Sequence, residues 1–263
     1  MTVPRSEIDS EALSSAPEDA GVAERVEAIR RRVANACERA GRDPAGVTLL
    51  GAAKLQPVER LAAACAAGLA VIGENRVDEA EAHREALAAR APDAAGPPDA
   101  ADAADTVEWH LIGPLQSNKA RRAAELFDAV HSIDRLKIAR VLDRHLGDLG
   151  RRVPALIEVN LGGEETKHGF APAGLAEAVR PLADLEHLEI SGLMAIPPPS
   201  GDPEGMRPWF RRLRELRDEL ATRPEWAAWA GWLSMGMSDD FEVAVEEGAT
   251  HVRIGTALFG SRG

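Results

Sequence analysis

Eight short apolar runs, separated by stretches of helical periodicity, constrain the fold of this 263-residue chain more than any other feature. The runs, each typical of a buried strand, are VTLLGAA (47–53), AVIG (70–73), EWHLIG (108–113), AVHSI (129–133), VPALIEVN (153–160), LEISGLMAI (188–196), WLSMG (232–236) and THVRIG (250–255). Helical patterns lie between most of them, including 57–67, 76–90, 135–147, 204–221 and 239–247. Strands that alternate with helices pair in parallel, and eight such units close a barrel. The sequence therefore predicts an α/β fold, a single (β/α)8 TIM-type barrel. An open doubly wound sheet is the alternative, because periodicity does not reveal closure.

Three segments outside this pattern set the domain organisation. Residues 1–18 are polar and acidic and have no apolar period, which predicts a disordered N-terminal extension. Residues 22–40 carry apolar side chains at three- and four-residue steps, which predicts an extra N-terminal helix before the first strand. Residues 89–106 are mainly Ala, Asp and Pro, which predicts a flexible insertion. We therefore expect one barrel domain over residues 19–263.

Composition excludes several classes of partner. A net charge of −12 opposes binding to a nucleic-acid backbone, and no apolar stretch is long enough for a membrane span. The two cysteines, Cys37 and Cys65, suggest neither a disulfide framework nor a metal site, which favours a reducing cytoplasm. An acidic chain without an exposed apolar strand edge predicts a monomer.

The turns after the seventh and eighth strands have the residue types of a phosphate site. Gly236 allows a tight turn, and Ser238 is a suitable N-cap for the helix that follows. Gly255 and Thr256 open a second helix in the same way. Ordinary capping explains either turn alone. In a (β/α)8 barrel, however, these two neighbouring positions are where phosphate commonly binds.

Charged residues flank both turns. Asp239 and Asp240 must point outward, or be balanced by the helix dipole, if a phosphate dianion binds nearby. Arg253 lies two residues before Gly255, so strand alternation places its side chain on the same face as that turn. It could contact a ligand there, and a salt bridge at the barrel rim is the alternative.

Lys54 ends the first strand, which neighbours the eighth in a closed barrel. Only four of the 31 basic residues are lysine, so a position that keeps lysine suggests an amine that must react with a carbonyl. The apolar residues that flank Lys54 are expected to remove it partly from solvent. Lys167, after the fifth strand, is the rival amine, and a helix-start lysine is the alternative role for Lys54. An amine, a phosphate site and an arginine together predict a phosphorylated aldehyde held as a Schiff base, for which pyridoxal 5′-phosphate (PLP) is the commonest ligand.

The sequence resembles the PLP homeostasis proteins, also called the proline synthase co-transcribed family, whose fold is similar to the barrel of alanine racemase. The matching stretches are LLGAAKLQP around Lys54, IGEN (72–75), WHLIGPLQSNK (109–119), SIDRLKIA (132–139), GLMAI (192–196), SMGMSDDFEVAVEEG (234–248) and VRIGTALFG (252–260). The resemblance implies that Lys54 forms the Schiff base and that Arg253 faces the pyridine nitrogen. It also implies a phosphate site formed by Met237, Ser238, Gly255 and Thr256, and a ring pocket lined by Asn75, Asn160 and Met194.

The resemblance implies a role in intracellular PLP homeostasis with little or no catalytic turnover, and apo-enzymes that use PLP as partners. A PLP-dependent amino-acid racemase and a Schiff-base aldolase on the same barrel are the alternatives. A racemase of the alanine type needs a second acid/base, which in that family is a tyrosine, and this chain contains no tyrosine. We therefore expect a non-catalytic PLP carrier.

Overall fold

The computed structural model describes residues 21–90, 107–164, 167–226 and 229–260. The predicted N-terminal extension, 1–18, lies outside the described residues. So do residues 91–106 of the predicted insertion, whose first two residues instead complete a helix.

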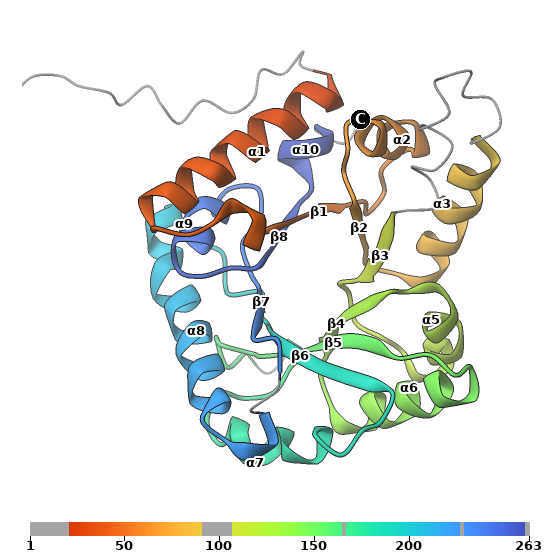
Figure 1. Cartoon of the computed structure of the whole chain (residues 1–263), viewed down its shortest axis with the longest axis vertical. Helices are drawn as coiled ribbons and strands as arrows, with labels where there is room; N and C mark the ends of the chain where they lie inside the picture. Colours follow the sequence, from red (N-terminus) through yellow and green to blue (C-terminus); the bar gives the residue numbers. More distant parts are fainter. Residues whose placement is uncertain (1–20, 91–106, 165–166, 227–228, 261–263) are drawn as a thin grey trace, which may run out of the picture.

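Eight parallel strands form a closed barrel in chain order (Figure 1). They are β1 (Thr48–Ala52), β2 (Val71–Glu74), β3 (Glu108–Leu111), β4 (Ala129–Ile133), β5 (Val153–Glu158), β6 (Leu188–Met194), β7 (Trp232–Ser234) and β8 (His251–Ile254). The barrel closes where β1 pairs with β8, in a register that runs from Thr48↔His251 to Gly51↔Ile254. The predicted closed barrel is confirmed, and the open sheet is excluded.

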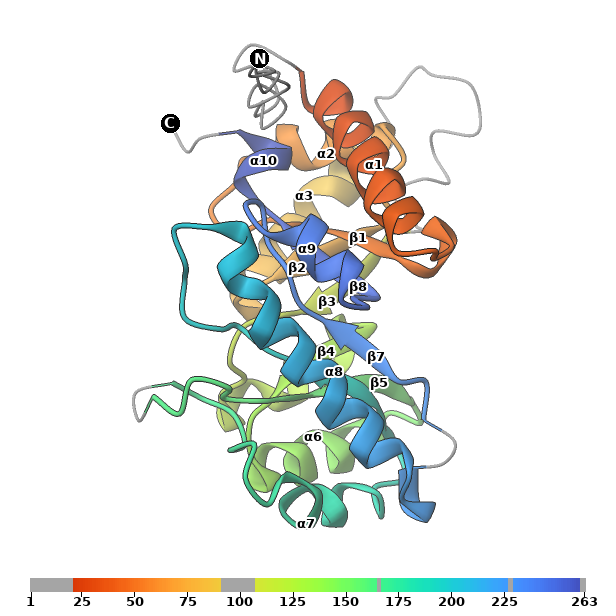
Figure 2. The same ribbon diagram turned by 90° about the vertical axis from the view of Figure 1, so that its left-hand side faces the viewer.

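The helices surround the strands (Figures 1 and 2). Their bounds are α1 (Val22–Arg39), α2 (Val58–Ala66), α3 (Val77–Arg90), α5 (Ala120–Leu126), α6 (Leu136–Asp148), α7 (Leu175–Val179), α8 (Arg207–Ala221), α9 (Phe241–Glu246) and α10 (Thr256–Phe259). The predicted N-terminal helix is α1, which lies beside α9 and α10. In the described part of the chain, no helix combines the length and apolarity needed to cross a bilayer.

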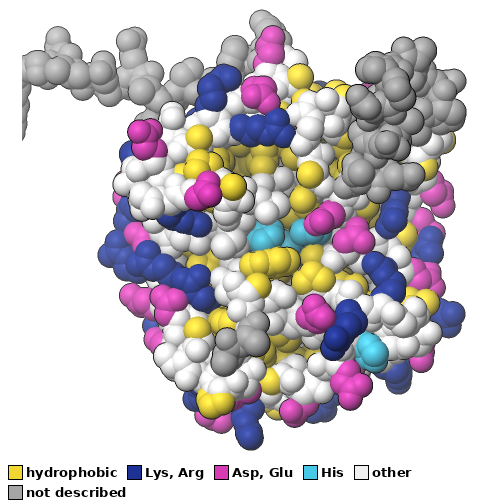
Figure 3. Space-filling view, in the orientation of Figure 1, with side chains coloured by type: hydrophobic (Ala, Val, Ile, Leu, Met, Phe, Trp, Pro, Cys, Tyr) yellow, Lys and Arg dark blue, Asp and Glu magenta, His cyan; other side chains and the backbone are white. Residues whose placement is uncertain are grey.

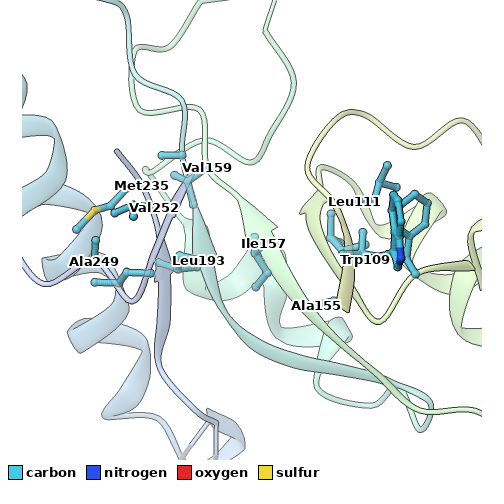
Figure 4. Packing of buried hydrophobic residues seen from close by; sticks show 14 of the residues in the cluster. Trp109, Leu111, Ala155, Ile157, Val159, Leu193, Met235, Ala249 and Val252 are labelled. Atoms are coloured by element: carbon cyan, nitrogen blue, oxygen red, sulfur yellow. The ribbon is translucent and has the colours of Figure 1, made fainter. Parts of the chain in front are cut away.

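Strand alternation divides the interior into two layers of different polarity. On β3, Trp109 and Leu111 face outward into the apolar layer between strands and helices (Figure 4). His110 lies between them in sequence, so strand alternation puts its side chain on the inner face. On β8, Val252 likewise joins the outer layer, whereas Arg253 is buried and bonded to residues of other strands. The outer layer holds most of the apolar core, and part of the barrel interior is polar. This polar interior lies directly beneath the predicted site.

Candidate functional site

Lys54 lies at the C-terminal rim of the barrel, beside the turn that opens α10. The β1–β8 register places Ala52 next to Gly255, where an added Cβ would lie 3.6 Å from the Ala52 carbonyl oxygen. Lys54 follows two residues later, in a turn whose next residue, Leu55, has the unusual φ of 57°. Chain closure therefore brings the amine's segment to the edge of the predicted phosphate site.

The surroundings of Lys54 differ from those of two other lysines. Lys119 pairs with Asp78 at 2.7 Å, and Lys167, the rival amine, pairs with Glu164. Lys54 has no ion pair or hydrogen bond of its amine among the described residues. Its side chain is exposed, so the expectation that its flanking apolar residues shield it is wrong: Ala53 is buried, but the turn carries Lys54 outward. An unpaired, accessible amine is free to meet a carbonyl carbon.

The loop after β7 is held by its own residues. Gly236 has φ +90°, and a Cβ there would lie 2.5 Å from the Ala244 Cβ, so this position requires glycine. Asp240 is buried, and its Oδ1 accepts a hydrogen bond from the Met237 backbone N–H at 2.6 Å. Asp239 is exposed. Asp240 is thus tied to the loop backbone, where it occupies the Met237 N–H, and Asp239 lies at the surface.

Ser238 joins the two predicted phosphate turns. Its hydroxyl oxygen accepts a hydrogen bond from the Ala257 backbone N–H at 3.2 Å, in the first turn of α10. The prediction that Ser238 caps its own helix is wrong, because α9 begins at Phe241 and has no side-chain cap. Thr256 is exposed at the start of α10. The hydroxyls of two neighbouring loops therefore lie at one rim, as the phosphate prediction requires.

Arg253 lies inside the barrel with only 4% of its surface exposed. Its Nη1 donates to the Ser234 hydroxyl at 2.7 Å, and its Nη2 donates to the Ala195 carbonyl oxygen at 3.1 Å. The alternative of a rim salt bridge is wrong, since Arg253 forms no ion pair with a described carboxylate. Burial lowers the pKa of Arg253 to about 10, against the opposing effect of Asp240 and Glu158. The guanidinium therefore remains charged at neutral pH.

The three residues expected to line a ring pocket have different surroundings. Met194 is fully buried at the end of β6, opposite Ser234 of β7. Asn75 follows β2 and packs so closely on Gly113 that a Cβ there would lie 2.4 Å from the Asn75 carbonyl oxygen. Asn160 donates its amide to the backbone oxygens of Glu164 at 2.9 Å and of Lys167 at 3.4 Å. Asn160 thus holds the loop after β5, and its buried Oδ1 has no hydrogen-bond partner among the described residues.

Sequence reasoning missed a set of polar side chains inside the barrel. Ser234 of β7 and His131 of β4 are fully buried, and a 2.9 Å contact joins the Ser234 Oγ to the His131 Nδ1. His110 of β3 continues this contact series. The signal was the placement of histidines at inward positions of the strands EWHL and AVHSI, which a search for sequence-adjacent metal-ligand pairs does not detect. No group of metal-ligating side chains is found within the described residues.

Known proteins with this arrangement define a class. The family model for the alanine racemase N-terminal domain matches residues 25–263. The pyridoxal phosphate homeostasis protein of Aquifex aeolicus is 44% identical over 239 residues, which cover 91% of this chain and 97% of that protein. The protein of the same name from Pseudomonas aeruginosa is 42% identical over 241 residues and covers 92% and 96%. The structure of PipY from Synechococcus elongatus with PLP bound has a TM-score of 0.74 and 36% identity, covering 91% of this chain and 100% of PipY.

The fold and the family model first define the class: a barrel protein of the alanine racemase N-terminal type. Within this class, the chain belongs to the pyridoxal phosphate homeostasis protein family, because its relatives match nearly their whole length.

Proposed function

We propose that this protein binds PLP as a Schiff base on Lys54 and serves PLP homeostasis with little or no turnover. Bound PLP supplies an aldehyde that condenses with a primary amine and a ring that withdraws electrons from it. The names of the Aquifex and Pseudomonas relatives and the PLP-bound PipY structure support PLP as the ligand. The observation that carries the Lys54 assignment is an exposed lysine, with no partner for its amine among the described residues, in the segment that β1–β8 pairing brings beside the turn into α10.

The residues present fit the charges of PLP. A phosphate dianion would meet the hydroxyls of Ser238 and Thr256 and the backbone around Met237 and Gly255, with Asp240 held on the Met237 N–H and Asp239 at the surface. Arg253 would face the pyridine nitrogen. Asn75, Asn160 and Met194 would line the ring.

The charge on Arg253 supports a carrier rather than a catalyst. A guanidinium has donors only, so it discourages protonation of the ring nitrogen beside it. An unprotonated ring is a weaker electron sink, and amino-acid chemistry on PLP depends on that sink. The absence of tyrosine from the sequence removes the second acid/base of an alanine-type racemase. We further propose a cytoplasmic monomer that delivers PLP to apo-enzymes.

Borohydride reduction followed by peptide mapping tests the proposal. PLP bound to the wild-type chain should be fixed by reduction on the peptide that contains Lys54, and Lys54→Arg should lose this label while keeping its fold. Lys167→Arg is the matched control and should retain the label. Labelling on Lys167, or spread evenly over the lysines, would refute the assignment. Sustained formation of D-alanine from L-alanine by the PLP-loaded protein would contradict the carrier role.

A further inference from the structure

Five side chains form a continuous hydrogen-bonded series across the barrel interior, which we call the interior chain. From one end to the other they are Arg253, Ser234, His131, His110 and Glu108. After the Arg253–Ser234 bond of 2.7 Å, the contacts are Ser234 Oγ to His131 Nδ1 at 2.9 Å, His131 Nε2 to His110 Nδ1 at 3.0 Å, and His110 Nε2 to Glu108 Oε2 at 3.2 Å. The series joins β8, β7, β4 and β3.

With both imidazole rings neutral, the two ends of the interior chain fix the direction of every bond in it. A guanidinium can only donate, so the Ser234 oxygen accepts from Arg253. At the other end an ionised carboxylate can only accept, so His110 donates its Nε2–H to Glu108. A neutral His110 ring then carries no proton on Nδ1, so this nitrogen accepts the Nε2–H of His131. The His131 Nδ1 in turn accepts the Ser234 hydroxyl proton.

The charge states that this assignment requires of His131 and Glu108 agree with the surroundings of these two groups. Burial, followed by the neighbouring histidines and Arg253, lowers the pKa of His131 well below 6.5, so its ring is neutral. The hydrogen bond from His110 lowers the pKa of Glu108, which keeps the carboxylate ionised. The opposite direction would require a protonated Glu108 or a doubly protonated His110, and it would leave the Ser234 hydroxyl proton without a partner in the series.

Other titratable groups face the interior chain without joining it. The ring of His251 lies 5.3 Å from that of His131, but its Nδ1 contacts the Thr250 hydroxyl at 2.8 Å. Burial lowers the pKa of His251 to about 3, so it adds no charge beside the series. Asp240 and Glu158 act on Arg253 at the other end.

The far end of the interior chain reaches solvent at the mouth of the barrel opposite Lys54. The Glu108 side chain is 62% exposed, whereas the other four members are buried. Glu108 and His110 line a cavity of about 720 Å³ together with Thr48 and Trp232, which lie at the starts of their strands. Figure 3 shows histidine and acidic side chains together at the centre of this face.

We propose that Glu108 is a positioning residue for Arg253 and acts on it through His110, His131 and Ser234. The Glu108 carboxylate accepts the His110 proton, so His110 accepts from His131 and His131 accepts from Ser234. The Ser234 hydroxyl proton therefore always points to His131. Its lone pairs then always face the guanidinium, so Arg253 keeps a fixed acceptor. In this way the protonation state of Glu108, at the N-terminal mouth of the barrel, sets the orientation of the Arg253 guanidinium. The effect on the ligand rests on the proposed function, whereas the hydrogen-bond direction does not.

The test compares Glu108→Gln with Glu189→Gln in the full chain. Glu189 is a matched control, because it also lies near the start of a strand with an exposed side chain but pairs with Arg152 instead of a histidine. Nitrogen-15 NMR of the imidazoles in the PLP-free protein should find the proton on Nε2 of both His110 and His131. In Glu108→Gln we expect both tautomers and exchange-broadened guanidinium signals of Arg253. Glu189→Gln should match the wild type.

A second measurement follows the ligand. PLP titration by absorbance should show a dissociation constant about three- to tenfold weaker for Glu108→Gln, the effect of one weakened hydrogen bond. Histidines protonated on Nδ1 in the wild type would overturn the direction of the interior chain. Unchanged tautomers, guanidinium signals and PLP affinity in Glu108→Gln would overturn the positioning role. A wild-type protein that shows the expected tautomers but binds no PLP would refute the proposed function and leave the hydrogen-bond direction supported.

Discussion

Replacing Gly236 by alanine tests how tightly the loop after β7 is packed on α9. At φ +90° an alanine enters the left-handed region, which costs about 1–2 kcal/mol. Its Cβ would also lie 2.5 Å from the Ala244 Cβ and 3.0 Å from the Phe241 Cα, and overpacking of this kind costs about 1–3 kcal/mol. The free energy of unfolding should therefore fall by about 2–5 kcal/mol, the sum of these two costs.

Two other glycines separate the backbone cost from the steric cost. Gly41 has φ +63° but nothing within 4 Å of an added Cβ, so Gly41→Ala should cost only the backbone part, about 1–2 kcal/mol. Gly46 has neither a positive φ nor a close neighbour, so Gly46→Ala should stay within about 0.5 kcal/mol of the wild type.

Thermal unfolding followed by circular dichroism measures the three variants. Each kcal/mol lowers the Tm of a chain of this size by about 2–4 °C, so Gly236→Ala should lose at least about 4 °C. A Gly236→Ala variant no less stable than Gly41→Ala would show that the loop does not press on α9. The same variant should weaken PLP binding, because the displaced loop carries the hydroxyl of Ser238.

Three further predictions concern single polar groups. Ser238→Ala should weaken PLP affinity by about tenfold or more, because a hydrogen bond to a charged group is lost; Ser200→Ala, in an exposed loop, is the control, and equal affinities in titration would contradict the phosphate assignment. The stability of the protein should fall as pH rises above 6.5, since the 2.6 Å hydrogen bond to buried Glu74 raises the pKa of His83. This stabilisation is fully present below pH 6.5, where His83 is protonated, and is lost as the pH rises through the pKa of His83 in the folded state. Denaturant titrations at several pH values measure the free energy of unfolding, and its decrease with pH should be smaller in His83→Gln. Glu247→Gln should destabilise the protein by about 3 kcal/mol, because three arginines converge on this buried carboxylate and two of them, Arg211 and Arg214, have no other ion pair among the described residues; a change below about 1 kcal/mol in urea unfolding would refute this.

The positions of the strands, and the amine and hydroxyl side chains that follow them, could be predicted from local sequence patterns. The run AVHSI matches β4 from Ala129 to Ile133, and the other seven runs each contain or overlap their observed strand. Lys54, Ser238 and Thr256 were singled out because amines, hydroxyls and glycines after buried strands have recognisable local contexts. The same local logic misplaced the Ser238 hydrogen bond, since its partner, Ala257, lies 19 residues away.

The orientations of side chains required coordinates. Whether the turn after β1 turns Lys54 inward or outward depends on backbone angles such as the φ of 57° at Leu55, which a non-glycine residue rarely adopts. Arg253 gave no local sign that its acceptors would be a serine hydroxyl and a backbone oxygen instead of a carboxylate. These acceptors lie 19 and 58 positions away from Arg253 in the chain.

The sequence by itself determined the eight β/α units and the strand ends that carry an amine, hydroxyls and a guanidinium. These follow from periodicity and turn chemistry, which act over a few residues. Only the tertiary structure decided that β1 closes on β8 and that Ser234 meets His131 across 103 positions of the chain. Such contacts depend on how the whole barrel closes, because closure sets which inward side chains of distant strands come within hydrogen-bond reach.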